Sequence, residues 1–105
     1  MNIAMIDDVK QDLDTLAATV NNYYAKRQLA VQLLTFSSPA DFWEDYTPGK
    51  YDLVFLDIYM EQGNGMNVAL SLRQKGDSCA LIFVTSSDAF AVASYDVQAT
   101  YYLLK

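Results

Sequence analysis

Strand-like and helix-like segments alternate along the whole chain, and this alternation restricts the possible folds more than any other feature. Three runs are apolar at nearly every position, as is typical of strands that are covered on both faces of a sheet. Between the runs, apolar residues such as Leu13, Leu16 and Val20 recur at helical spacing. The expected strands are about 2–6, 30–36, 52–56, 80–84 and 100–104, and the expected helices are about 9–27, 38–46, 66–75 and 89–94.

Strict alternation of this kind predicts βαβ units with right-handed crossovers, and therefore a parallel sheet. We expect one α/β domain over residues 1–105, doubly wound, with five parallel strands in the order 2-1-3-4-5. Ser38 and Asp88 are expected to cap the second and fourth helices, and Gly76 to end the third. The segment 59–65 is expected to be a loop that contains glycine.

Three carboxylates stand where two of the apolar strands end. Asp7 and Asp8 directly follow the first strand, and Asp57 directly follows the third. In the expected order these strands are neighbours, and ligands bind at the carboxyl ends of strands at such a position. Converging carboxylates repel one another, and a cation relieves that repulsion. Oxygen ligands suit Mg²⁺, so the pattern predicts a magnesium site.

Composition narrows the possible functions. The chain of 105 residues has 13 acidic and 7 basic side chains, a net charge of -6, which argues against direct binding to nucleic acid or to an anionic membrane. No apolar stretch approaches membrane-spanning length. The absence of His excludes Ser-His-Asp and Cys-His nucleophiles and His metal sites. The single Cys79 opens an apolar run, which indicates a core residue and a reducing, cytoplasmic compartment.

Taken in order, these residues resemble the receiver domain of two-component response regulators, which has the CheY-like variant of the flavodoxin-like fold. The resemblance spans the chain and rests on residues at the carboxyl ends of four expected strands: Asp7, Asp8, Asp57, Thr85 and Lys105. The segment 93–105, ASYDVQATYYLLK, is similar to the LytR/AgrA-type subgroup. Receivers of that subgroup are usually joined to a LytTR DNA-binding domain, which is absent from this chain.

The resemblance implies that Asp57 accepts a phosphoryl group from the phosphohistidine of a sensor histidine kinase. It implies that Thr85 and Lys105 bind phosphoryl oxygens. The implied Mg²⁺ ligands are the carboxylates of Asp7, Asp8 and Asp57 and the backbone carbonyl of Tyr59.

The resemblance also implies a switch rather than a turnover enzyme. Phosphorylation would move Thr85 and Tyr102 and change the surface of the fourth helix and fifth strand, and so control transcription through the separate DNA-binding domain.

The sequence departs from the family pattern at three places. The expected fifth strand contains Tyr101-Tyr102-Leu103, where the subgroup often has Asp-Tyr-Leu. The loop after Asp57 lacks the usual Pro. The chain ends at Lys105, where the family continues with a Pro and a fifth helix. We therefore expect uncovered apolar surface beside the first helix, and a homodimer or another form of self-association.

Other interpretations remain open at this point. Taken alone, Asp8 is typical of a helix cap, Lys105 of a solvated terminal residue, and Tyr102 of a packing residue. The main functional alternative is a receiver-like interaction module without phosphorylation. A phosphatase of the haloacid-dehalogenase type requires a second Asp where Tyr59 stands, and a Ca²⁺ or Mg²⁺ binding domain leaves Thr85 and Lys105 without a role.

Overall fold

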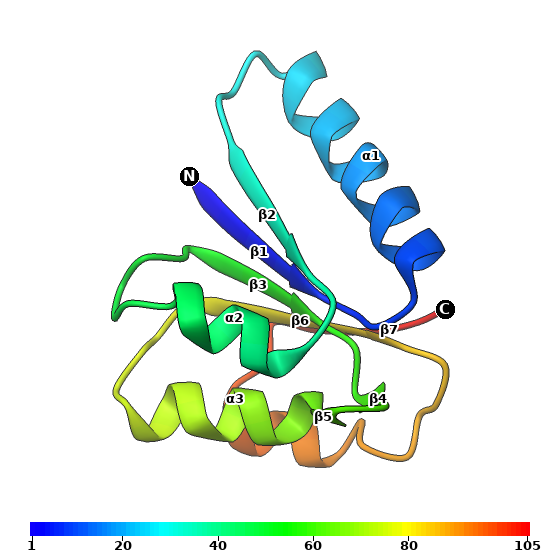
Figure 1. Ribbon diagram of the computed structural model, residues 1–105, viewed down its shortest axis with the longest axis vertical. Coiled ribbons are helices and arrows are strands. Elements are labelled where there is room, and N and C mark those ends of the chain that lie inside the picture. Colours follow the sequence, from blue (N-terminus) through cyan, green and yellow to red (C-terminus); the bar gives the residue numbers. More distant parts are fainter.

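A single parallel sheet crosses the molecule, and the computed structural model describes all of residues 1–105 (Figure 1). Its strands are hydrogen-bonded in the order β2-β1-β3-β6-β7. Their bounds are β1 (Asn2–Ile6), β2 (Gln32–Phe36), β3 (Leu53–Leu56), β6 (Ala80–Thr85) and β7 (Tyr101–Leu104). Because β6 and β7 are the fourth and fifth strands of this sheet along the chain, the expected order 2-1-3-4-5 is confirmed.

The two faces of the sheet carry different helices (Figure 1). Helix α1 (Lys10–Lys26) lies on one face, and α2 (Pro39–Asp45), α3 (Gly65–Gln74) and the 3₁₀ helix η1 (Ala93–Val97) contribute to the core on the other. Successive strand residues alternate between these cores. In β1, Ile3 and Met5 pack toward α1, whereas Ala4 and Ile6 pack toward α2 and α3. No helix of the fold is both long enough and apolar enough to cross a bilayer.

The expected helix ends are mostly confirmed. The Ser38 hydroxyl accepts a hydrogen bond from the backbone N–H of Asp41 at 3.2 Å and so caps α2. Helix α3 stops two residues before Gly76, whose φ of +77° suits glycine. Helix α1 ends in the same type of turn, but there the left-handed residue is Gln28, with a φ of +55°. Its N–H donates to the carbonyl of Ala25 at 3.0 Å.

The helix expected over 89–94 is wrong in both position and type. Residues 89–92 form turns, and the helical segment is the 3₁₀ helix Ala93–Val97. The residue that caps the first turn is Ser87, not Asp88, because the Ser87 hydroxyl accepts the N–H of Ala89 at 3.1 Å. A contact distant in sequence explains the shift: the Arg73 guanidinium on α3 donates to the carbonyl of Val97 at 2.6 Å and holds the end of η1 in place.

The segment after Asp57, expected as a loop, contains a short antiparallel hairpin of β4 (Tyr59–Met60) and β5 (Gly63–Asn64). Two glycines, one in β5 and one at the start of α3, allow close contacts between this segment and its neighbours. A Cβ on Gly63 would lie 2.9 Å from the side chain of Pro39. A Cβ on Gly65 would lie only 2.0 Å from the backbone oxygen of Asp57. Glycine at position 65 therefore allows α3 to begin directly against the strand that ends at the candidate site.

Apolar surface lies beside α1, as expected. A groove there is lined mainly by apolar side chains, among them Val20, Tyr23, Phe55, Ile82 and Tyr101. Tyr23 is 50% exposed and Tyr101 is 62% exposed. Self-association through this surface stays a prediction.

Candidate functional site

The candidate site is built from residues at or just beyond the carboxyl ends of the strands of the sheet. The β1–β3 register pairs Ile6 with Leu56, so Asp7 and Asp57 emerge next to each other. The hydrogen-bond ladder continues one residue past the strands: the N–H of Asp57 donates to Ile6 at 3.0 Å, and the N–H of Lys105 donates to the last residue of β6 at 2.8 Å. The backbone at these positions is therefore held by the sheet itself.

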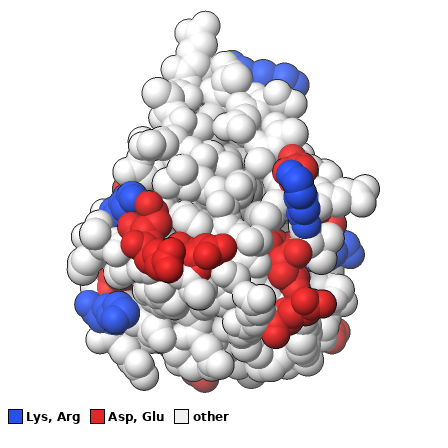
Figure 2. All heavy atoms as spheres, in the orientation of Figure 1, with Lys and Arg blue, Asp and Glu red and all other residues white.

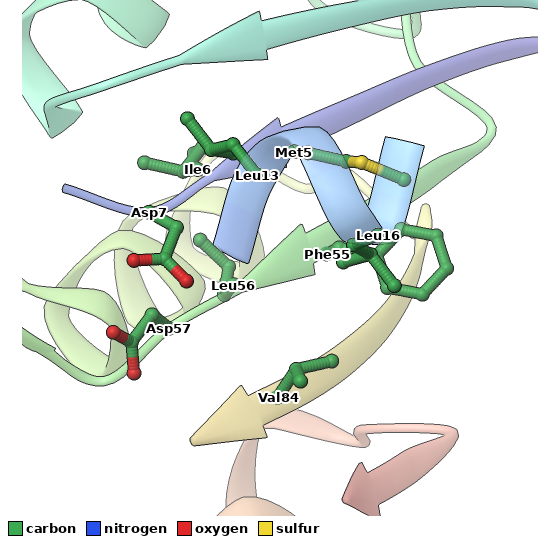
Figure 3. Close-up of a pocket in the computed structure, with 9 residues that line it drawn as sticks. All are labelled: Met5, Ile6, Asp7, Leu13, Leu16, Phe55, Leu56, Asp57 and Val84. Carbon is green, nitrogen blue, oxygen red and sulfur yellow. The ribbon is translucent and has the colours of Figure 1, made fainter. Parts of the chain in front are cut away.

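Three carboxylates converge at this edge. Asp7, Asp8 and Asp57 each offer an oxygen, and these three oxygens lie within 4.8 Å of one another. Figure 3 shows Asp7 and Asp57 side by side, beyond the apolar ends of their strands. Both are buried, whereas Asp8 is half-buried and accepts a hydrogen bond from the N–H of Glu61 at 2.9 Å. Figure 2 shows acidic groups gathered below the start of α1, on the side of β4 and β5.

The Lys105 side chain lies among these acids. Its ammonium donates to Asp7 at 2.8 Å and to Asp57 at 3.2 Å. A third hydrogen bond of 2.8 Å goes to Asp12, in the first turn of α1. The ammonium offsets part of the negative charge of the cluster. Because it lies beside the Asp57 carboxylate, it can donate a charged hydrogen bond to an anion formed on Asp57.

Burial and charge act on these groups in opposite directions. Burial raises the pKa of Asp57 above its usual range, and the nearby Asp7 carboxylate raises it further. The Lys105 ammonium opposes both effects without cancelling them. Burial alone would lower the pKa of Lys105, but its hydrogen bonds to Asp12 and Asp7 outweigh burial and raise that pKa. A bound cation would therefore stabilise the charged form of Asp57.

The Thr85 hydroxyl is a buried polar group without a partner. Thr85 ends β6 and is fully buried, and its Oγ1 makes no hydrogen bond. The hydroxyl nevertheless lies near enough to Asp57 to lower the pKa of that carboxyl slightly. A buried hydroxyl that lacks a partner costs folding free energy, on the order of 1–3 kcal/mol. Such a group is available to donate to a ligand oxygen placed between it and Asp57.

Two tyrosines flank the site. The Tyr102 hydroxyl donates to the backbone carbonyl of Ser87, and its ring packs against Phe83, so the side chain is turned inward. Burial raises the pKa of Tyr102. The ring of Tyr59, in β4, makes an edge contact with Phe90, at 5.8 Å between ring centroids. This contact joins the hairpin to the segment that links β6 to η1.

The structure thus brings the five site residues expected from the sequence to one edge of the sheet, with Tyr59 and Tyr102 beside them. Asp8 does not cap α1, because the helix begins after Val9 and the Asp7 carboxylate accepts the Val9 N–H. Sequence reasoning missed Asp12 as a partner of Lys105. Its position in the first turn of the helix that directly follows Asp7 and Asp8 is the signal that was available.

Comparison with known proteins is consistent with this geometry. The family model described as the response regulator receiver domain matches residues 3–105. Among curated proteins, the sensory transduction protein LytT of Bacillus anthracis is 28% identical over 106 residues, covering 100% of this chain and 41% of that protein. The transcriptional regulatory protein LytR of Staphylococcus aureus is 34% identical over 56 residues, 53% of this chain and 23% of that protein.

Solved structures share the fold. The response regulator TrrA of Thermotoga maritima, in complex with Mg²⁺-BeF, has a TM-score of 0.82 at 23% identity, covering 99% of this chain and 85% of that chain. The BeF₃-activated receiver domain of RstA from Klebsiella pneumoniae has a TM-score of 0.81 at 23% identity, covering 100% of this chain and 86% of that chain.

The strand order and the family match define a receiver domain. The chain belongs to the response regulator receiver domain family. Its relatives include the LytT and LytR regulators. The chain spans about two fifths of the length of LytT.

Proposed function

We propose that this receiver domain accepts a phosphoryl group on Asp57 from the phosphohistidine of a sensor histidine kinase. The observation that carries the proposal is the surroundings of one carboxylate. Asp57 is buried, the Lys105 ammonium lies 3.2 Å away, and the nearby Thr85 hydroxyl is buried without a partner. The Asp57 carboxylate is a nucleophile. The Thr85 hydroxyl is free to donate and the Lys105 ammonium can exchange one of its acceptors, so both can donate hydrogen bonds to the oxygens of a phosphoryl group on Asp57.

The acidic cluster fits Mg²⁺. The carboxylates of Asp7, Asp8 and Asp57 are oxygen donors that lie close enough to share one small cation, and the backbone carbonyl of Tyr59 is the proposed fourth protein ligand. Bound Mg²⁺ would supply charge neutralisation and orientation of the phosphoryl oxygens. The solved structure of TrrA is a complex with Mg²⁺ and BeF, which supports the same ion for this chain.

The chain's own residues then have distinct tasks. An Asp57 carboxylate oxygen attacks phosphorus, and the bond from phosphorus to the donor nitrogen breaks with its electron pair left on nitrogen. The Lys105 ammonium and the Thr85 hydroxyl donate hydrogen bonds to phosphoryl oxygens. No general base is required, because the attacking carboxylate carries no proton.

The output of the domain follows from the neighbours of Thr85. A hydrogen bond from its hydroxyl to a phosphoryl oxygen would draw the end of β6 toward Asp57. This movement would disturb the Tyr102–Ser87 hydrogen bond two residues further on. The surface formed by η1 and β7 would then change its affinity for a partner.

We propose that the whole protein regulates transcription in the cytoplasm through a LytTR-type DNA-binding domain outside this chain, as the resemblance to LytT and LytR supports. The receiver itself does not contact nucleic acid, consistent with its net charge of -6. Self-association through the apolar surface beside α1 is part of the same proposal.

Intact mass after incubation with Mg²⁺ and acetyl phosphate tests the proposal. The unchanged chain should gain one phosphoryl group, and the gain should disappear with a chelator or with Asp57→Asn. Asp96→Asn is the matched control, because Asp96 is an exposed aspartate on η1. No gain by the unchanged chain, or an equal gain by Asp57→Asn, would contradict the assignment and favour an interaction module without phosphorylation.

A further inference from the structure

The Lys105 ammonium has no free donor in this structure. A lysine ammonium carries three N–H groups, and three carboxylates surround this one. Asp7 and Asp12 accept at 2.8 Å each, and Asp57 accepts at 3.2 Å. A phosphoryl oxygen on Asp57 that takes a hydrogen bond from Lys105 must therefore replace the Asp57 carboxylate oxygen or displace Asp7 or Asp12.

The three acceptors are not equivalent. The side chains of Asp7 and Asp57 are 11% and 6% exposed, and both belong to the carboxylate cluster that fits a cation. The Asp12 side chain is 42% exposed and is not a member of that cluster. Water can solvate an exposed carboxylate that loses its partner, whereas a buried one would be left without compensation. Asp7 and Asp12 are the two acceptors that keep their carboxylates when Asp57 is phosphorylated. Of these, Asp12 is therefore the one that Lys105 releases at the lower cost.

On the basis of the proposed function, we propose that Asp12 is a positioning residue that holds Lys105 in the resting domain and competes with the phosphoryl group for its ammonium. This competition shifts the equilibrium between the phosphorylated and unphosphorylated domain toward the unphosphorylated form. An acyl phosphate carries up to about two negative charges where the Asp57 carboxylate carried one, and Lys105 can move closer to that charge once it leaves Asp12. Asp12 thus lowers the affinity of the site for an anion on Asp57 without contacting that anion.

Binding of the anion BeF₃⁻ at saturating Mg²⁺, followed by fluorine NMR or calorimetry, tests this inference without requiring phosphoryl transfer. BeF₃⁻ serves as a phosphomimetic in the solved structure of RcsB from Salmonella enterica. Asp12→Asn keeps the shape of the side chain and removes its charge. We expect it to tighten BeF₃⁻ binding about two- to fivefold, the range for a partly exposed ion pair.

Two further variants isolate the role of Lys105. Asp14→Asn removes the same charge from the same helix, but Asp14 pairs with the exposed Lys10, so its BeF₃⁻ affinity should stay within about 1.5-fold of the unchanged chain. In a Lys105→Gln background the ammonium is missing, and Asp12→Asn should lose most of its effect. A thermal melt of each variant checks that it is folded.

The outcomes separate the two proposals. No BeF₃⁻ binding by the unchanged chain refutes the proposed function. Binding by the unchanged chain with equal or weaker binding by Asp12→Asn overturns the role of Asp12 alone. The same tightening in the presence and absence of Lys105 also overturns it, because the effect would then be one of general charge rather than competition for the ammonium.

Discussion

Replacement of Gly65 by Ala tests how tightly the candidate site is built into the fold. The new Cβ would lie 2.0 Å from the backbone oxygen of Asp57, whereas ordinary contacts begin at 3.4 Å, so the two segments must separate by about 1.4 Å. The atom it meets belongs to the backbone and cannot rotate away. Overpacking of this kind costs up to about 3 kcal/mol. Alanine restricts the unfolded chain more than glycine does and so regains up to about 1 kcal/mol of that, which leaves a net loss of about 2 kcal/mol.

Urea unfolding measures this loss, and we expect the midpoint to fall by about 1 M. Labelling of Asp57 by acetyl phosphate should slow by at least about tenfold, because displacements of 1 Å at a reacting group have effects of that size or more. Gly49→Ala is the matched control. Gly49 has a φ of +77° but no atom within 4 Å of its Cβ position, so alanine there should reduce stability without slowing labelling. A Gly65→Ala chain as stable and as readily labelled as the original would refute the close contact.

Three other substitutions give separate tests. Thr85→Val removes a buried hydroxyl that has no partner, so urea unfolding should show a gain of about 1 kcal/mol, whereas labelling by acetyl phosphate should slow about tenfold or more. Gln28→Gly relieves a φ of +55° and should stabilise the chain by about 0.5–1 kcal/mol; a lower melting temperature would contradict this. Burial raises the pKa of Asp77, but hydrogen bonds from Tyr46 and the Cys79 N–H outweigh burial and lower it. The unfolded chain therefore binds that proton more readily, so Asp77→Asn should cost about 1 kcal/mol at pH 7 and progressively less below about pH 4, in urea titrations at each pH. A cost that does not change with pH would contradict this.

The parts of the fold that could be predicted are those set by local pattern. Strands buried on both faces leave continuous apolar runs, and Asp7 and Asp57 mark where two of those runs end. Once the alternation of strands and helices implies a parallel sheet, the meeting of these carboxylates follows from topology alone. For this reason the acidic cluster and its position could be inferred before any coordinate was known.

The parts that could not be predicted depend on contacts between residues distant in sequence. The helical segment before β7 is held at its end by Arg73, which is 24 positions away from Val97, and no local signal reveals that bond. The link between Asp12 and Lys105 joins residues 93 positions apart. The hairpin after Asp57 has too few residues to produce a detectable period.

The extension of the hydrogen-bond ladder past the strands separates the backbone that the sheet holds from the backbone that it does not hold. The backbone amides of Asp57 and Lys105 are hydrogen-bonded to the sheet, so the sheet fixes the backbone position of these two site residues. The segment from Ser86 to Val92 contains neither helix nor strand. Under the proposed function, substitutions in that segment would alter the surface next to η1 while the sheet keeps the backbone of Asp57 and Lys105 in place. Under that proposal, the partner of the domain can change while the phosphorylation site keeps its geometry.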